Sequence, residues 1–540
     1  MKIKRHSNLT ALSIALVCAG SVCVSSAHAA DAEREKVELM HETTLSLIKL
    51  LVQQGVIKQE AADEMLKKAE QTAAGKLAAA RAEEQAKPTD AATPEKGVVR
   101  VTYVPEHVKR EIRDQVRQEV IAQAKQERWG DVNAVPEWLD RLKWEGDFRL
   151  RYQNEMFADS NAPEAFFQND GQNVTNTTEN RERERIRLRL GLNAHVTSGV
   201  DVGVRITTGN TTDPVSTNQT LGNTANKYSL VLDRAFVKYA PVDSLTISGG
   251  RIPNPFFSTD LVWDDDLNFE GLAVNLKPGA TEKREFTPSF TAGIFPLQEI
   301  EQSTSVKAPD KWLYGAQAAL EWAPSTRARF KVGAAYYQYQ DIASTLNPTP
   351  STGLYDLSKP QFSQKGNSRF IFDSDADNNG NPSGSTADPV YGLAADYRIA
   401  NLTLVADFAE FFPMHIIGTF DWARNLGFDQ ADILKRTGQN IKPETDGYLA
   451  KLTIGYPNVS ERHEWQAYVG YRYLERDAVL DAFTDSDFHL GGTNHKGFII
   501  GGQYGIHKNT WLSARWMSSD EISGLPLSID VFQLDLNAKF

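Results

Sequence analysis

Arginine recurs at every second position in the segment RERERIRLRL, residues 181–190. Successive side chains of a β-strand point to opposite faces, so a strand would place all these arginines on one face and Ile186, Leu188 and Leu190 on the other. A helix would scatter the same residues around its axis and would form no apolar face. A row of fixed cations beside water attracts anions. The segment therefore predicts a strand with one wet, cationic face and one oily face.

Two sets of charged residues could face each other across an enclosed, water-filled space. The basic set consists of strand arginines: Arg149, Arg151, Arg185, Arg187, Arg189 and Arg205. The acidic set lies in PNPFFSTDLVWDDDLNFEG, residues 253–271: Asp260, Asp264, Asp265 and Asp266. If this loop folds inward, the two sets would create a field across a constriction, and charged rings of this kind determine ion preference.

Two alternatives to this field stay open. The acidic run could remain at the outer surface, solvated or in contact with another copy of the chain. Single arginines could instead pair with carboxylates on the same wall, such as Asp147, Asp233 and Asp535. The sign of any ion preference also stays open, because the arginine row favours anions while the chain as a whole is acidic.

A weaker metal pattern occurs in a polar segment. Asp373, Asp375 and Asp377 alternate as the carboxylates of calcium loops do, but Asn378 stands where an EF-hand needs Gly and Gly384 where it needs Glu. An EF-hand is excluded, and a looser calcium site or a plain polar loop remains. The histidines show no catalytic spacing and no Gly-rich phosphate loop occurs, so we predict no enzyme and no cofactor.

The first residues have the pattern of a secretory signal peptide, residues 1–29: basic residues, an apolar run and Ala27-His28-Ala29 as a cleavage site. A first transmembrane helix is the alternative. Both cysteines, Cys18 and Cys23, lie in this segment, so the mature chain would have no thiol. Loss of its three basic residues would change the net charge from −12 to −15, which argues against nucleic acid as a partner.

Three further segments precede the strands. Residues 30–86 have a helical composition and a narrow apolar seam of coiled-coil type, which fits either a solvated hairpin or self-association. Residues 87–97 contain Pro88 and Pro94 and form a linker. Residues 98–142 contain an amphipathic helix with apolar residues four apart.

From residue 143 to 540 the apolar pattern has period two. Short turns alternate with long polar loops, as in outer-membrane barrels, and the connections predict about sixteen strands. Residues 391–399 could form one more strand, and we assign them to a long loop. The last strand, IDVFQLDLNAKF, ends in Phe540. No stretch of about 20 apolar residues follows the signal peptide. The predicted fold is an all-β transmembrane antiparallel barrel with an N-terminal periplasmic α-helical, coiled-coil-like extension.

Several motifs of this chain resemble those of a known protein family: WEGDFRLRY (144–152), RIRLRLGL (185–192), GGRIPNPF (249–256), WDDDLNFEG (263–271) and the segment 470–498. Over roughly residues 98–540, the chain resembles the "putative porin" family of Gram-negative bacteria. The resemblance implies a water-filled pore in the outer membrane for small hydrophilic solutes or ions. It also implies contact with outer-membrane lipid, a homotrimer, and a role for Phe540 as an assembly signal for the barrel-assembly machinery. Two other functions stay open: a loop-plugged anchoring barrel, and a sheath that houses a partner protein.

Overall fold

The computed structural model describes residues 139–278, 285–348, 353–373 and 389–540. The predicted signal peptide, coiled-coil-like segment, linker and most of the amphipathic helix region lie outside these residues. So do Asp375 and Asp377 of the calcium candidate. Among the described residues, no helix is long and apolar enough to cross a membrane.

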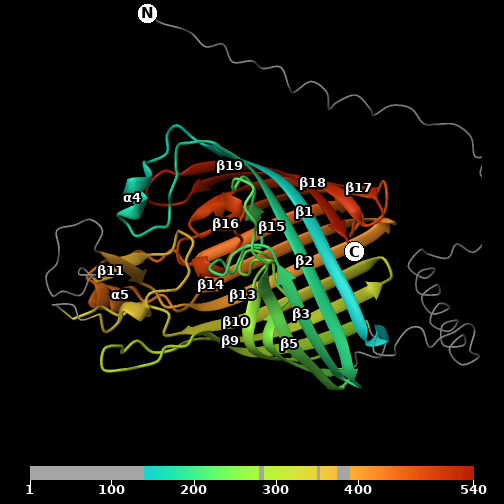
Figure 1. Ribbon diagram of the computed structural model, residues 1–540, viewed down its shortest axis with the longest axis horizontal. Coiled ribbons are helices and arrows are strands. Elements are labelled where there is room, and N and C mark those ends of the chain that lie inside the picture. The colour runs from blue at the N-terminus through green and yellow to red at the C-terminus, as the bar shows by residue number, and fades with distance from the viewer. Residues whose placement is uncertain (1–138, 279–284, 349–352, 374–388) are drawn as a thin grey trace, which may run out of the picture. The chain divides into compact units, whose positions relative to one another are not determined.

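The described chain forms a closed antiparallel β-barrel (Figure 1). The main sheet has seventeen strands. The two-residue β4 (Gln219–Thr220) pairs with β2 alone and is not part of the barrel wall, so sixteen barrel strands remain. The first and last strands pair with each other and close the barrel. The barrel strands are β1 (Leu142–Phe157), β2 (Arg181–Thr197), β3 (Val200–Thr207), β5 (Val231–Val242), β6 (Leu245–Pro253), β7 (Asn268–Leu276), β8 (Phe286–Gln298), β9 (Lys311–Ser325), β10 (Ala328–Gln340), β13 (Arg398–Phe411), β14 (Met414–Asn425), β15 (Asp446–Gly455), β16 (Trp465–Leu474), β17 (His495–His507), β18 (Thr510–Glu521) and β19 (Ser528–Lys539). The predicted strand number is confirmed.

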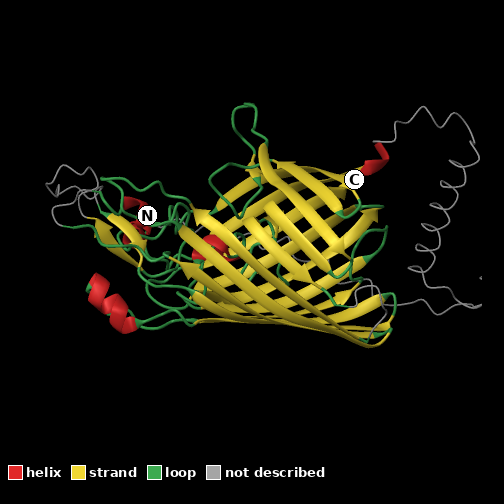
Figure 2. Cartoon of the chain, turned by 90° about the horizontal axis from the view of Figure 1, so that it is seen from below, coloured by secondary structure: helices red, strands yellow, loops and turns green. Residues whose placement is uncertain are grey.

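The connections alternate in length, as the sequence predicts. Two-residue turns such as 198–199 and 508–509 lie at one end of the barrel, and the long loops gather at the other end (Figure 2). The loop between β10 and β13 contains its own small sheet of β11 (Arg369–Asp373) and β12 (Val390–Leu393). Of residues 391–399, those up to residue 397 therefore belong to the loop and not to the barrel wall, as expected, whereas Arg398 and Ile399 already pair with β10 as the start of β13. The long loops also contain the helices α4 (Glu164–Gln168) and α5 (Gln430–Thr437) and the short 3₁₀ turns η3 (Asp356–Ser358), η4 (Asp481–Phe483) and η5 (Phe488–Leu490), while η2 (Leu139–Arg141) precedes β1.

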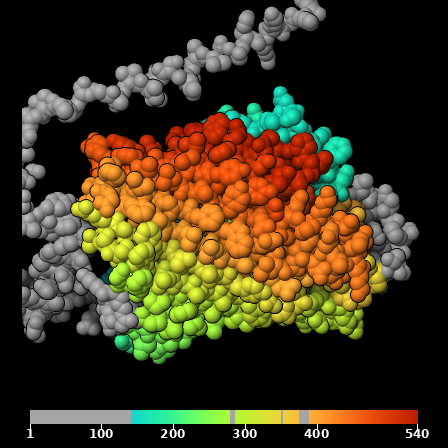
Figure 3. Space-filling view, turned by 180° about the vertical axis from the view of Figure 1, so that it is seen from behind, coloured from blue at the N-terminus to red at the C-terminus, as the bar shows by residue number. Residues whose placement is uncertain are grey.

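The period-two pattern separates an apolar outer face from a polar inner face. On β1, Phe148 and Leu150 are 37% and 40% exposed on the outside, whereas Arg151 is 2% exposed on the inside. Large apolar side chains are also exposed on β13–β16, among them Leu404, Phe420 and Leu452. These strands form the orange outer surface in Figure 3. A water-facing sheet would place polar residues there, so the pattern is typical of a wall that meets an apolar phase.

Candidate pore and its charged wall

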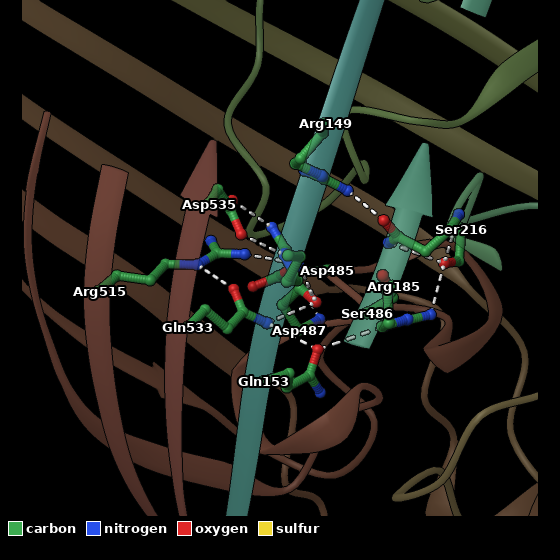
Figure 4. Close-up of polar contacts among 12 residues, drawn as sticks. Arg149, Gln153, Arg185, Ser216, Asp485, Ser486, Asp487, Arg515, Gln533 and Asp535 are labelled. Carbon is green, nitrogen blue, oxygen red and sulfur yellow. Dashed lines mark hydrogen bonds and ion pairs between the residues drawn. The ribbon is translucent and has the colours of Figure 1, made fainter. Parts of the chain in front are cut away.

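Strands β1 and β2 place the predicted arginines on the inner face of the barrel. Their register sets Arg149 opposite Arg187 and Arg151 opposite Arg185, while Asp147 lies opposite Arg189. Directly opposed like charges repel each other, so this wall needs neutralising groups from elsewhere. Figure 4 shows that such groups come both from neighbouring strands and from loops that enter the barrel.

Four of the predicted arginines, namely Arg151, Arg187, Arg189 and Arg205, pair with carboxylates on the same wall. Asp147 accepts from the Arg187 guanidinium at 2.9 Å and from Arg189 Nε at 2.7 Å. Arg205 donates to Asp233 on β5. Wall carboxylates of this kind are the alternative that the sequence left open, and for these arginines it is confirmed.

Arg151 and Arg515 share the carboxylate of Asp487. Arg151 also forms a two-pronged pair with Asp535 on β19, at 2.7 and 2.9 Å, and donates to Asp487 at 3.0 Å. Arg515 on β18 donates to the same Asp487 side chain. Asp487 precedes the 3₁₀ turn η5, so a loop supplies the central anion of this cluster (Figure 4). Burial would raise the pKa of Asp487, but the nearby arginines outweigh it and hold the pKa well below its usual range.

Arg149 and Arg185 differ from their neighbours because they contact neutral oxygens. Arg149 donates to the amide oxygen of Asn218. Arg185 reaches the Gln153 amide oxygen at 3.3 Å and the Ser216 hydroxyl at 3.4 Å. Within the described part of the chain, neither guanidinium forms an ion pair with a carboxylate, and the buried Nε of each has no acceptor.

The loop between β6 and β7, residues 254–267, lies inside the barrel. The hydroxyl of Thr259 donates to Asp421 on β14 at 2.6 Å, and the backbone NH of Phe257 donates to Gln317 on β9 at 2.8 Å. Side chains from β9 and β14 point inward at these positions, so the loop spans the lumen rather than its rim. The alternative that this acidic loop stays at the outer surface is therefore wrong.

The four acidic residues of this loop have different partners. Asp266 pairs with Arg189 at 3.0 Å and approaches Arg187 at 3.6 Å, whereas Asp260 pairs with Arg472 on β16 at 2.7 Å. Burial alone would raise the pKa values of Asp266 and Asp260, but the charges of these arginines outweigh it and lower both pKa values. Asp264 is buried, and its carboxylate accepts from the Ser486 backbone NH at 2.9 Å.

Asp264 and Asp265 remain without an arginine partner among the described residues. Burial and the charges of Asp266 and Asp485 raise the pKa of Asp264. The Asp265 side chain reaches solvent. Partial desolvation inside the barrel and, to a lesser extent, the nearby charges of Asp260 and Asp266 raise the pKa of Asp265 to about 6.

A second loop, residues 475–494, also enters the barrel, and its acidic residues are not among those predicted from the sequence. Its Asp485 pairs with the fully buried Arg472 at 3.0 Å, and its Asp487 is the anion between Arg151 and Arg515. The available signal was the alternation of acidic residues in DSDFH, residues 485–489, which resembles a strand pattern but lies in a loop.

Aromatic side chains fill part of the lumen. Trp263 is 1% exposed, and its ring centroid lies 4.9 Å from that of Phe269 and 5.0 Å from that of Tyr337 on β10. Phe256 packs edge-on against the same Tyr337 at 5.0 Å. Since aromatic pairs at these distances are favourable beyond their buried area, this cluster anchors the 254–267 loop to the wall opposite β1 and β2 in the strand order.

Open volume remains beside β1 and β2 at both ends of the barrel. A cavity of about 330 Å³ at the long-loop end is lined by Arg183, Arg185 and Glu155 among others. A cavity of about 760 Å³ at the short-turn end is lined by Lys143 of β1 and His195 of β2, with further basic side chains from nearby strands.

The remaining predicted site residues are Asp373 in a long loop and Phe540 at the end of the last strand. Asp373 ends β11 and accepts from Asn347 at 2.6 Å. No group of three metal-ligating side chains occurs within the described ranges. Phe540 forms two backbone hydrogen bonds with Gly146, at 2.8 and 3.0 Å, and its ring is 66% exposed.

Known proteins allow the fold to be compared. The similar solved structures include OprB of Pseudomonas putida (12% identity, TM-score 0.41, covering 76% of this chain and 97% of that chain) and the loop-L8 deletion mutant of OmpT, an outer membrane protein of Vibrio cholerae (12%, 0.39, 74% and 100%). The outer membrane channel DcaP of Acinetobacter baumannii is another (12%, 0.38, 74% and 97%). No curated protein matches the chain. The profile of the family described as "Putative porin" matches residues 41–540. The chain therefore belongs to this family of outer-membrane channel proteins.

Proposed function

We propose that the chain forms a water-filled pore through which small hydrophilic solutes or ions diffuse passively across the outer membrane. The observation that carries this proposal is the polar wall of β1 and β2, which continues between the cavities at the two ends of the barrel. Between those cavities the side chains of Arg187 and Arg189 are still 14% and 18% exposed. A barrel of about sixteen strands is wide enough to hold water, so a path along this wall needs only that the loops leave it open.

The inward loops narrow this path to one side of the barrel. Residues 254–267 supply Asp266 beside Arg187 and Arg189 of β2, and residues 475–494 supply Asp487 beside Arg151 of β1. Charge of both signs around a narrow passage orients dipolar solutes and sets ion preference. We therefore assign the predicted arginines and the acidic loop to the pore lining.

The assembly of the pore is part of the same proposal. The apolar outer face would contact lipid, and three copies would associate as a homotrimer in the outer membrane. The exposed ring of Phe540 stands at the end of the last strand, where the barrel-assembly machinery could read it. The N-terminal extension would lie in the periplasm.

The test is single-channel recording of the full folded chain in a planar bilayer. Stepwise currents that scale with salt concentration are the expected result. Protein that is shown to be folded by its heat-dependent gel mobility, yet carries no current, would contradict the proposal.

A second function is favoured by one observation, the aromatic cluster around Trp263 inside the lumen. A barrel filled in this way could serve as a plugged anchor in the envelope. The same recording separates the two functions, because a plugged barrel stays silent until the cluster is disrupted.

A further inference from the structure

We propose that Arg149 and Arg185 form a binding site for a small oxyanion, a carboxylate or a phosphate, inside the barrel. This inference rests on the proposed pore, because the site would give that pore a preference for anions. It distinguishes Arg149 on β1 and Arg185 on β2 from the other strand arginines, which the sequence presents as equivalent.

The two side chains have unused hydrogen-bonding capacity. A guanidinium carries five N–H donors and matches the two oxygens of a carboxylate or phosphate. Arg149 uses one donor on Asn218, and the contacts of Arg185 at 3.3 and 3.4 Å lie at the long limit of a hydrogen bond. The buried Nε of each has no acceptor among the described residues. Buried donors without acceptors are rare and call for a partner.

The charges around the two arginines also favour a bound anion. In the cluster of Figure 4, Asp485 already forms an ion pair with Arg472. The carboxylates of Asp487 and Asp535 therefore remain to neutralise the guanidinium groups on β1, β2 and β18. Both carboxylates form ion pairs with Arg151, and Asp487 also forms an ion pair with Arg515. The cationic charges of Arg149 and Arg185 are left over.

The strand register places both arginines beside further positive charges. Arg149 lies directly opposite Arg187, and Arg185 lies directly opposite Arg151. Like charges in these positions destabilise a sheet. A bound anion would relieve both repulsions at once, which neutral amide and hydroxyl oxygens achieve only in part.

One short loop segment, residues 216–218, joins the two side chains. Asn218, which accepts from Arg149, donates its amide to the Ser216 hydroxyl at 3.3 Å, and Ser216 in turn contacts Arg185. Both guanidinium groups are thus held at the same segment, residues 216–218, with neutral polar atoms between them. Neutral partners orient an arginine without cancelling its charge.

Access to the site comes from the long-loop end of the barrel. The cavity of about 330 Å³ has Arg185 in its lining, together with Arg181, Arg183 and Lys365, against the carboxylates of Glu155 and Asp213. Glu155 is already paired with Arg183. A cleft lined mostly by one sign of charge concentrates ligands of the opposite sign, so the cavity would deliver anions to Arg185.

The test measures binding and conduction on the full folded chain. Calorimetric titration with sodium phosphate and, separately, sodium acetate tests binding, and the reversal potential under a potassium chloride gradient tests selectivity. We expect one or both anions to bind and the potential to report chloride preference. The double variant R149Q/R185Q should bind at least about tenfold more weakly, since it loses the charge-assisted hydrogen bonds to the anion.

Three variants make this result specific. R327Q removes an exposed arginine, paired with Glu410 at the short-turn end, and should behave as the unmodified chain. R149K/R185K keeps the positive charges but loses the planar guanidinium groups, which can donate to two oxygens at once. This variant should keep chloride preference while binding the oxyanion less tightly. R185Q alone covers the case in which the double variant does not fold, because the long contacts of Arg185 have little structural weight.

The outcomes separate this site from the proposed function. If the folded chain carries no current but binds phosphate or acetate through these arginines, the site stands and the pore does not. If the chain conducts but binds neither anion, or if R185Q and the double variant leave binding and reversal potential unchanged, the inference is overturned. Phosphate binding without acetate binding would identify the tetrahedral anion, and the reverse result would identify carboxylates.

Discussion

Replacement of Asp487 by Asn should loosen the charged cluster more than any exposed substitution could. The carboxylate accepts from Arg151 with both oxygens at 3.0 Å, from Arg515, and from the Gln533 amide at 3.0 Å. Asn has the same shape but no charge, so it leaves Arg515 without a carboxylate and Arg151 with only Asp535.

The expected cost follows from the burial of these groups. The side chains of Asp487 and Arg151 are 15% and 2% exposed, and removal of one partner from a buried pair costs about 3–5 kcal/mol. We expect about 3 kcal/mol at neutral pH, because Asn can still accept one hydrogen bond. The assay is guanidinium unfolding of the barrel in detergent. Asp432→Asn, an exposed partner of Arg436 four residues away, is the control and should cost no more than about 0.5 kcal/mol.

The pH dependence has a definite sign. The arginines hold the pKa of Asp487 well below its usual range, so its stabilisation is present above the unfolded-state pKa of about 3.9 and is lost as the pH falls below that value. The two chains should therefore differ most at neutral pH and converge in strong acid. Equal costs for D487N and D432N at neutral pH would refute this account of the cluster.

Three further predictions concern the loops and the barrel seam. Because the pKa of Asp265 is raised to about 6, the reversal potential should move toward anion preference as the pH falls through 6, and D265N should lose this shift. Trp263→Ala removes a side chain that is 1% exposed, so the single-channel conductance should rise and the barrel should lose about 3 kcal/mol of stability; an unchanged conductance would place the cluster away from the ion path. Gly146→Ala would put a Cβ 2.4 Å from the Phe540 ring, which must then turn aside at about 1 kcal/mol, measurable as a lower temperature of gel-mobility change.

The barrel could be predicted from the sequence because its rules are local. Strand alternation needs only the order of residues, as in the segment 181–190, and the loop lengths follow once the strands are placed. The pairing of Arg187 with Asp147 was also foreseeable, because both residues lie on the inner faces of neighbouring strands.

The loops could not be predicted in the same way because their partners are distant. Asp487 lies 336 positions from Arg151 in the chain, and DSDFH has no period that would direct it inward. Arg149 and Arg187 have the same residue type and the same face. Arg187 has Asp147 on the neighbouring strand, whereas Arg149 contacts Asn218 of the segment 216–218, whose path depends on the whole fold.

The pairing of β1 with β19 has a consequence for how the molecule is made. The ladder runs over eleven residue pairs, from Asp147 with Lys539 to Phe157 with Ile529. Until β19 has been synthesised and docked, both β1 and β18 present open edges whose backbone groups find no water in lipid. Contacts between residues so far apart in the chain form slowly. Closure is therefore the last step of folding, and a nascent chain has to be shielded at two edges at the same time.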